Sequence, residues 1–188
     1  MVVIHMDTMR DTGILSKLYE GMDCKVFLNP DYSEKDNVME AVKSDDLVII
    51  TGHGDANGLY GVDMNGYFID ASDADVLRGR KVIGIWCYAS EFADRYGLEG
   101  FFTSMFISNA QEFNEIFLSR EECATDWEIE RETGVFCKRV NCLVANRFPM
   151  ERWVEILQAV CEKHIPYVRY NYEALSYFDG KKKKTENK

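Results

Sequence analysis

The sequence predicts an α/β fold, a three-layer α/β/α sandwich in which helices cover both faces of a mostly parallel central sheet. Short continuous apolar runs at residues 2–6, 46–51 and 81–86 are typical of strands that are buried on both faces. Segments with helical spacing separate these runs, and strands that alternate with helices form parallel sheets with right-handed crossovers. A flavodoxin-like strand order is the alternative arrangement of the same elements.

The first strand, at residues 2–6, leads into a polar loop. A short helix is expected over residues 14–19, where apolar residues recur at helical spacing. A second strand follows at residues 25–28 and ends at Asn29 and Pro30, because proline has no N–H to donate to a sheet.

The next helix is expected to begin at Ser33 and to run to about Lys43. Asp36 stands three positions after Ser33 as a variant of the capping box. Val38 and Val42 fall on one face of this helix, which we expect to pack on the sheet. The strand at 46–51 then returns to the sheet.

A small hairpin is expected beyond that strand. Asn65 and Gly66 lie between the apolar runs 59–64 and 67–70, and Asn-Gly between two such runs is a strong short-range signal for a hairpin.

A short helix over residues 73–77 should precede the next buried strand. Ser72 is its expected cap, and Gly79 is expected to end it. The strand at 81–86 then runs directly into Cys87.

The last part of the chain is predicted to be mainly helical. Helices are expected at residues 90–96 and 109–118 and over most of 121–161, with interruptions near Gly134 and at Pro149. Further strands are expected at 101–107 and, at the edge of the sheet, within 165–177.

Length and composition fit one domain. The chain has 188 residues, of which 46% are hydrophobic and only 3 are proline, so it can bury roughly 70% of its unfolded surface. We expect a single domain over residues 1–180, with a core at 1–118 and a mostly helical part at 119–180. The lysine-rich residues 181–188 are expected to be a disordered tail.

The net charge of −10 favours protein or peptide partners, basic ones in preference, over nucleic acid or a membrane surface. No apolar run approaches the roughly 20 residues of a membrane span, and the first residues lack the basic region of a signal peptide. The 6 cysteines form no paired CxxC motif, which is typical of reduced thiols. We therefore expect a cytoplasmic location, while the sequence leaves the oligomeric state open.

Two reactive residues follow the two central strands. His53 comes just after the strand at 46–51, and Cys87 comes just after the strand at 81–86. The carboxyl ends of parallel strands lie at one edge of the sheet, and sequential strands are commonly neighbours. We therefore expect both side chains to reach one substrate bond.

This pair can carry out acyl transfer. A helix that begins near Ser90 or Glu91 would favour the Cys87 thiolate, and the imidazole of His53 can protonate a leaving amine. Gly54 has no Cβ, so its N–H can approach an oxyanion closely, and the N–H of Cys87 would be the second donor.

Other cysteine chemistries fit less well. A phosphatase-type Cys-x5-Arg loop would need arginine at position 93, which is Ala93, and the loop at 8–12 lacks the dense pattern of a phosphate site. Amidotransferases and α/β-hydrolases place the nucleophile before the histidine, whereas here the histidine comes first.

The order of these features resembles the caspase-like cysteine peptidases, a clan that includes caspases, gingipains, clostripain-type and separase-type enzymes and bacterial CHAT domains. The resemblance covers residues 1–110, and its specific part is Thr51-Gly52-His53-Gly54 with Ile85-Trp86-Cys87. It implies a dyad of His53 and Cys87 that cleaves a peptide bond through an acyl-enzyme, with no metal and no cofactor. Trp86 stands where the family commonly has a small residue.

Several residues are candidates for substrate binding. Arg10 could pair with an acidic side chain, as an arginine in the corresponding region of caspases does by resemblance, whereas Asp7, Asp11 or Glu91 would select Arg or Lys. The ring of Trp86 is expected to border the substrate side chain.

The remaining histidines and cysteines are expected to have structural roles. His5 and His164 have no cluster of reactive residues nearby in the sequence, and the spacing of Cys123, Cys137 and Cys142 fits no common zinc finger.

Two alternatives to a peptidase remain open. The first is a catalytically inactive interaction domain on the same fold that binds a partner beside the hairpin at 59–70. The second is a flavodoxin-like ligand-binding module.

Overall fold

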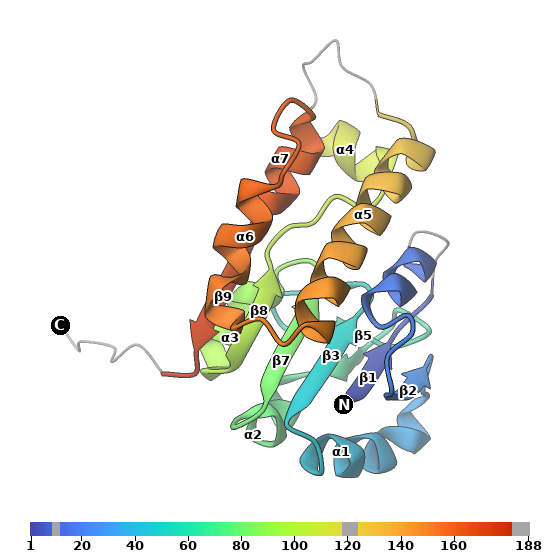
Figure 1. The fold of residues 1–188 in the computed structure, drawn as a ribbon. Coiled ribbons are helices and arrows are strands. Elements are labelled where there is room, and N and C mark those ends of the chain that lie inside the picture. The colour runs from blue at the N-terminus through green and yellow to red at the C-terminus, as the bar shows by residue number, and fades with distance from the viewer. Residues whose placement is uncertain (9–11, 118–123, 182–188) are drawn as a thin grey trace, which may run out of the picture.

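The computed structural model describes residues 1–8, 12–117 and 124–181, and its fold is α/β with a mostly parallel six-stranded sheet (Figure 1). The strands lie in the order β2-β1-β3-β7-β8-β9, in which the first five are parallel and β9 is antiparallel to β8. Their bounds are β1 (Val2–His5), β2 (Lys25–Leu28), β3 (Leu47–Thr51), β7 (Lys81–Ile85), β8 (Glu99–Thr103) and β9 (Leu175–Asp179).

Apart from β9, the main sheet follows a 2-1-3-4-5 order of parallel strands, which is the flavodoxin-like order. In such a sheet the chain passes from β1 to its neighbour β2 on one side, and then crosses to β3 on the other side of β1. The loops after β1 and β3 therefore diverge, and ligands bind in the crevice between them.

Helices cover both faces of the sheet. The face in front in Figure 1 carries the helices η1 (Gly13–Leu18), α4 (Ala110–Ile116), α5 (Asp126–Ala145), η4 (Met150–Arg152), α6 (Trp153–Ala159) and α7 (Pro166–Glu173). The opposite face carries α1 (Lys35–Lys43), α2 (Ala74–Leu77) and α3 (Ala89–Tyr96). Residues of β3 alternate between the two cores, with Ile49 in the first and Val48 and Ile50 in the second, as the two-residue period of a strand requires.

A second, three-stranded antiparallel sheet lies between β3 and β7 in the chain. It contains β4 (Gly54–Asp55), β5 (Gly58–Tyr60) and β6 (Tyr67–Ile69). The pairing of β5 with β6 confirms the predicted hairpin, but its turn is longer than two residues and is closed by a hydrogen bond from the Gly61 N–H to the Gly66 carbonyl, 2.8 Å long. The strand β4 has no counterpart in the prediction.

Two predicted helix caps are wrong. Asp31, not Ser33, caps the turn η2 (Tyr32–Glu34) in a capping box with Glu34, and α1 continues from this turn. Asp70, not Ser72, caps η3 (Ala71–Asp73) in the same way before α2. In both places a 3₁₀ turn precedes the α-helix, so the cap lies two residues earlier than the α-helical pattern indicates.

The helix α5 is continuous through Gly134, where the sequence predicted an interruption. A Cβ at this glycine would lie 3.1 Å from the Lys17 Nζ and 3.3 Å from the Ile14 Cδ1. The glycine is therefore explained by the close packing of η1 on α5 and not by a break in the helix.

The end of the chain also differs from the prediction. Most of the expected strand at 165–177 is the helix α7, with Pro166 in its first turn, and β9 begins only at Leu175. The expected strand at 101–107 is β8, which begins earlier and ends at Thr103. Residues 118–123 and the tail at 182–188 lie outside the described residues, as do the predictions made for them.

Candidate active site

His53 and Cys87 lie at equivalent places beyond two neighbouring strands. The strands β3 and β7 pair in parallel, with Thr51 opposite Ile85, so each reactive residue is two positions beyond the paired residues. Since neighbouring strands are about 4.8 Å apart, both residues are held at the same edge of the sheet. The predicted adjacency of the two strands is confirmed.

Hydrogen bonds fix the path of the chain into His53. The Gly52 N–H donates to the Ile85 carbonyl at 3.2 Å, and the Thr51 hydroxyl donates to the same oxygen at 3.2 Å. Gly52 has a φ of 143°, and a Cβ there would lie 2.7 Å from the Met6 carbonyl oxygen. Only glycine allows the chain to pass this close to the end of β1.

The turn that carries Cys87 is held against the end of β8. The Thr103 hydroxyl donates to the Trp86 carbonyl at 2.8 Å, and the Tyr88 N–H donates to the Ser104 carbonyl at 3.0 Å. Tyr88 has the left-handed backbone conformation, with a φ of 65°, and α3 begins directly after it. Cys87 therefore lies two residues before the first residue of α3, Ala89, which is one residue earlier than the predicted start at Ser90.

The Cys87 thiol donates a hydrogen bond to the Phe106 carbonyl, with the sulfur 3.6 Å from the oxygen. Phe106 belongs to the segment after β8, whose backbone is held by Asn171 of α7. The Asn171 side chain accepts from the Ile107 N–H at 2.8 Å and donates to the Ile107 carbonyl at 3.0 Å. Because the Phe106 carbonyl and the Ile107 N–H belong to one peptide group, Asn171 also fixes the carbonyl that accepts from Cys87.

Trp86 has a structural explanation that the sequence did not provide. It is 2% exposed, its indole N–H donates to the Asp55 carbonyl at 3.1 Å, and its ring packs on Phe92 of α3. A Cβ on Gly54 would lie 2.4 Å from the Trp86 Cδ1. Packing against this indole explains the glycine at position 54. The sequence had suggested only that a missing Cβ lets the Gly54 N–H approach an oxyanion.

His53 and Cys87 line one small cavity. Its volume is about 20 Å³, which is room for about one water-sized group. The other lining residues come from several elements: Thr12 and Leu15 after β1, Gly52 after β3, Ile85 and Trp86 at the end of β7, Phe106 and Ser108 after β8, and Thr133 on α5. The cavity thus lies beyond the carboxyl ends of β1, β3, β7 and β8, the edge at which such sheets usually bind ligands.

A larger open hollow lies on the other side of the Cys87 turn. Its volume is about 470 Å³, and Tyr88, Ser104, Met105 and Tyr170 are among the residues that line it. Burial, together with the nearby groups of Tyr88 and Cys87, raises the pKa of the Tyr170 phenol. Tyr170 and Tyr88, the neighbour of Cys87, thus border the same hollow.

The predicted substrate-binding residues are only partly brought to this site. Asp7 lies in the loop after β1 and accepts a hydrogen bond from the Thr12 hydroxyl at 3.2 Å, but neither Asp7 nor Glu91 lines the cavity. Glu91 is exposed on the first turn of α3. Arg10 and Asp11 lie outside the described residues.

The sequence analysis did not predict the residues that distant elements contribute to the site. Phe106, Ser108, Thr133 and Tyr170 reach the site from the segment after β8, from α5 and from α7. They carry no local motif, so only the fold brings them into view.

His5 has the structural role expected of it. It is 1% exposed, its Nδ1 pairs with the Tyr19 hydroxyl at 2.8 Å, and its Nε2 pairs with the Thr12 carbonyl at 3.0 Å. Burial lowers the pKa of His5. The neutral ring links β1 to the segment that contributes Thr12 to the cavity.

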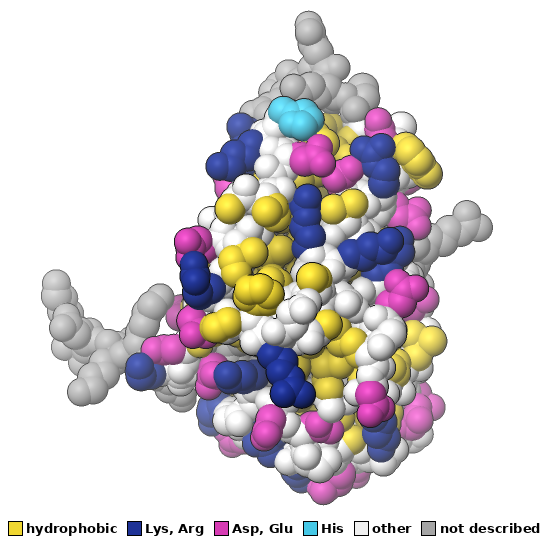
Figure 2. Space-filling model, viewed as in Figure 1, with side chains coloured by type: hydrophobic (Ala, Val, Ile, Leu, Met, Phe, Trp, Pro, Cys, Tyr) yellow, Lys and Arg dark blue, Asp and Glu magenta, His cyan; other side chains and the backbone are white. Residues whose placement is uncertain are grey.

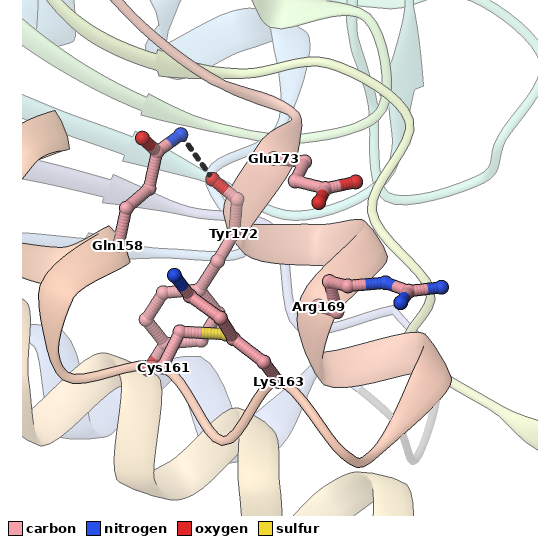
Figure 3. Close-up of a pocket in the computed structure, with 6 residues that line it drawn as sticks. All are labelled: Gln158, Cys161, Lys163, Arg169, Tyr172 and Glu173. Carbon is pink, nitrogen blue, oxygen red and sulfur yellow. Dashed lines mark hydrogen bonds between the residues drawn. The ribbon is translucent and has the colours of Figure 1, made fainter.

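A separate pocket of about 120 Å³ lies between α6 and α7 (Figure 3) and contains neither His53 nor Cys87. Its Gln158 donates to the Tyr172 carbonyl at 3.0 Å, and Cys161 points into it beside Lys163. Burial raises the pKa of the Cys161 thiol, which disfavours the thiolate at this pocket.

The face that carries α5, α6 and α7 mixes acidic and basic side chains, with hydrophobic side chains between them (Figure 2). Within the described ranges, no three His, Cys, Asp or Glu side chains gather to hold a metal ion. Among the same residues, none of the helices combines the length and apolar character that crossing a membrane requires.

Fold and site together define an α/β protein with a histidine and a cysteine at one sheet edge. Compared with known proteins, the chain matches no family model, no curated protein and no solved structure.

Proposed function

We propose that this protein is a caspase-like cysteine endopeptidase in which Cys87 is the nucleophile and His53 the general acid and base. The observation that carries the proposal is that both residues stand two positions beyond paired residues of adjacent parallel strands and line the same cavity. The chain order of strand, His-Gly, small antiparallel sheet, short helix and strand with cysteine agrees with the resemblance described above.

The reaction begins when His53 takes the proton of the Cys87 thiol. The sulfur attacks the carbonyl carbon of the scissile bond, and the N–H groups of Gly54 and Cys87 stabilise the oxyanion. The proton passes from His53 to the leaving amine as the C–N bond breaks, and a thioester remains. Water, deprotonated by His53, then attacks the thioester and the C–S bond breaks; His53 returns its proton to the Cys87 sulfur, and the released carboxylic acid ionises in water.

Ionisation of Cys87 removes its hydrogen bond to Phe106, because a thiolate has no proton to donate. The position of Cys87 two residues before Ala89, the first residue of α3, favours the thiolate, since the amide groups of the first helical turn carry partial positive charge.

The substrate in this proposal is a protein or peptide in the cytoplasm. The hollow of about 470 Å³ beside the Cys87 turn offers space for an extended peptide. The net charge of −10 favours peptides with a basic overall composition.

Replacement of the two proposed catalytic residues tests this function. Cys87→Ala and His53→Ala should each abolish cleavage of a mixed peptide library, measured by mass spectrometry of the products. Cys142→Ala, which changes an exposed cysteine on α5, is the matched control and should retain activity. Cleavage that survives in Cys87→Ala would rule the proposal out.

The second candidate function is that of a catalytically inactive interaction domain. The cavity of about 20 Å³ and the hydrogen bond of the Cys87 thiol to the Phe106 carbonyl favour it, because both are compatible with an un-ionised resting cysteine. A partner would then bind beside the sheet of β4, β5 and β6. Folded, pure protein that cleaves no peptide and whose Cys87 reacts like an ordinary thiol would support this candidate.

A flavodoxin-like ligand-binding module has less support. Ligand pockets for small molecules commonly measure about 300–1,000 Å³, whereas the cavity between the β1 and β3 ends measures about 20 Å³. A chromophore that remains bound through purification would contradict this assessment.

A further inference from the structure

Thr133 lines the cavity beside the two proposed catalytic residues, and its hydroxyl is buried and unpaired within the described part of the chain. The residue is 3% exposed and lines the same cavity as His53 and Cys87. Its Oγ1 has no hydrogen-bond partner within the described part of the chain. A buried hydroxyl normally has a partner, and a threonine within a helix commonly bonds the carbonyl four residues before it. This hydroxyl therefore has an unused donor and acceptor at the wall of the cavity.

The cavity suits a small and uncharged group. Leu15, Ile85 and Phe106 provide apolar walls, and among the described lining residues none is a carboxylate, a lysine or an arginine. With a volume of about 20 Å³, it accepts one or two non-hydrogen atoms. A charged side chain would lose its hydration there without gaining a partner of opposite charge from these residues.

We propose that this cavity binds the substrate side chain next to the scissile carbonyl, that it takes a serine, and that Thr133 determines this specificity. The inference rests on the proposed peptidase function. A residue whose carbonyl lies at Cys87 has its side chain directly beside it, and Cys87 and His53 border the cavity. The CH₂–OH group of serine fills the space and pairs its hydroxyl with that of Thr133.

The preference is measured with fluorogenic peptide amides that differ only in the residue before the cleaved bond. The serine substrate should have the highest kcat/KM and the alanine substrate the next, about three- to tenfold lower for the loss of one neutral hydrogen bond. Aspartate, lysine and arginine substrates should be cleaved at least about a hundredfold more slowly. Preferred cleavage after a charged residue would overturn the proposal.

The substitution Thr133→Val removes the hydroxyl and keeps the shape of the side chain. It should lower kcat/KM for the serine substrate to the level of alanine, while the alanine substrate changes by less than about twofold. Thr133→Ser retains the hydroxyl and should keep the serine preference, and thermal unfolding verifies that both variants fold. A serine preference that persists unchanged in Thr133→Val would also overturn the proposal.

Binding to the inactive Cys87→Ala protein separates this inference from the proposed function. The NMR signal of the ¹³C-labelled Thr133 methyl group is followed while acetylated peptides ending in serine amide, alanine amide or aspartate amide are added. A shift that saturates at lower concentration with the serine peptide supports the pocket even if the native protein cleaves nothing. Equal responses to all three peptides contradict the pocket even if the native protein is an active peptidase.

Discussion

The Cys87 sulfur lies 3.6 Å from the Phe106 carbonyl oxygen, to which the thiol donates a hydrogen bond. Two effects on this cysteine are therefore opposed. The hydrogen bond stabilises the neutral thiol, whereas the amino terminus of α3 stabilises the thiolate. Which effect is larger decides whether the histidine and cysteine at this sheet edge react.

If the helix terminus and His53 prevail, Cys87 should be alkylated first among the cysteines. With iodoacetamide at pH 6, we expect Cys87 to react at least about tenfold faster than the exposed Cys142, since only a thiolate attacks efficiently. Burial raises the pKa of Cys137, which should not react while the protein is folded. Peptide mass spectrometry after timed quenching gives each rate, and equal rates for Cys87 and Cys142 would contradict an activated thiol.

Gly54→Ala should destabilise the protein, because the new Cβ would lie 2.4 Å from both the Trp86 Cδ1 and the Gly58 carbonyl oxygen. The Gly58 backbone cannot move easily, so we expect a loss of about 1–3 kcal/mol in the free energy of unfolding. Urea titration followed by tryptophan fluorescence measures it. In the matched control, Gly66→Ala, the Cβ meets only the end of the Tyr32 side chain, at 3.0 Å. Similar losses in both variants would show that crowding by Gly58 and Trp86 is not the cause.

Replacing Asn171 should weaken the segment that faces Cys87. In Asn171→Ala the N–H and carbonyl of Ile107 both lose their partner, and we expect a cost of about 1–3 kcal/mol for each buried group left unpaired. Chemical denaturation gives the change, with Asn146→Ala at the exposed end of α5 as the control. The Cys87 alkylation rate should rise in Asn171→Ala, since the Phe106 carbonyl is no longer held in place. An unchanged Cys87 alkylation rate would show that the Asn171 contacts do not influence the reactivity of the thiol.

Stability should fall as the pH is lowered from 7 to 5, in part through His5. Burial lowers the pKa of His5 below its ordinary value of 6.5, so the unfolded chain binds this proton before the folded one does. The contribution of His5 is therefore fully present above pH 6.5 and is lost as the pH falls below it, by at most about 1.4 kcal/mol per pH unit. Urea midpoints at several pH values measure the slope. His5→Gln is expected to be less stable at pH 7 but to show a shallower dependence of stability on pH. An equal dependence in both proteins would mean that other groups cause the loss of stability.

The positions of most strands could be predicted from the sequence because buried parallel strands are apolar over their whole length, a signal that lies within each segment. The same reasoning placed His53 and Cys87 on neighbouring strands. It failed where tertiary contacts decide, as at Gly134, which lies inside α5 because η1 packs closely there. The tyrosines and valine of 165–177 favoured a strand, but Pro166 begins a helix instead.

The residues around the reactive pair could be predicted only in part. Thr133 lies in a helix far along the chain from Cys87 and has no motif around it, so its place in the cavity depends wholly on how α5 packs. Trp86 was expected to border the substrate; it does line the cavity, and its indole also joins the main sheet to the small one through Asp55, a contact that the sequence does not indicate.

The antiparallel pairing of β9 with β8 also has a consequence for the nascent chain during translation. The strand β8 ends at Thr103, but its outer neighbour begins only at Leu175, after all the helices of the front face. While the ribosome translates the residues between them, β8 presents an unpaired edge beside the apolar Phe101 and Phe102. Such an edge can pair with other chains, so we expect the nascent protein to be open to aggregation along β8 during this interval.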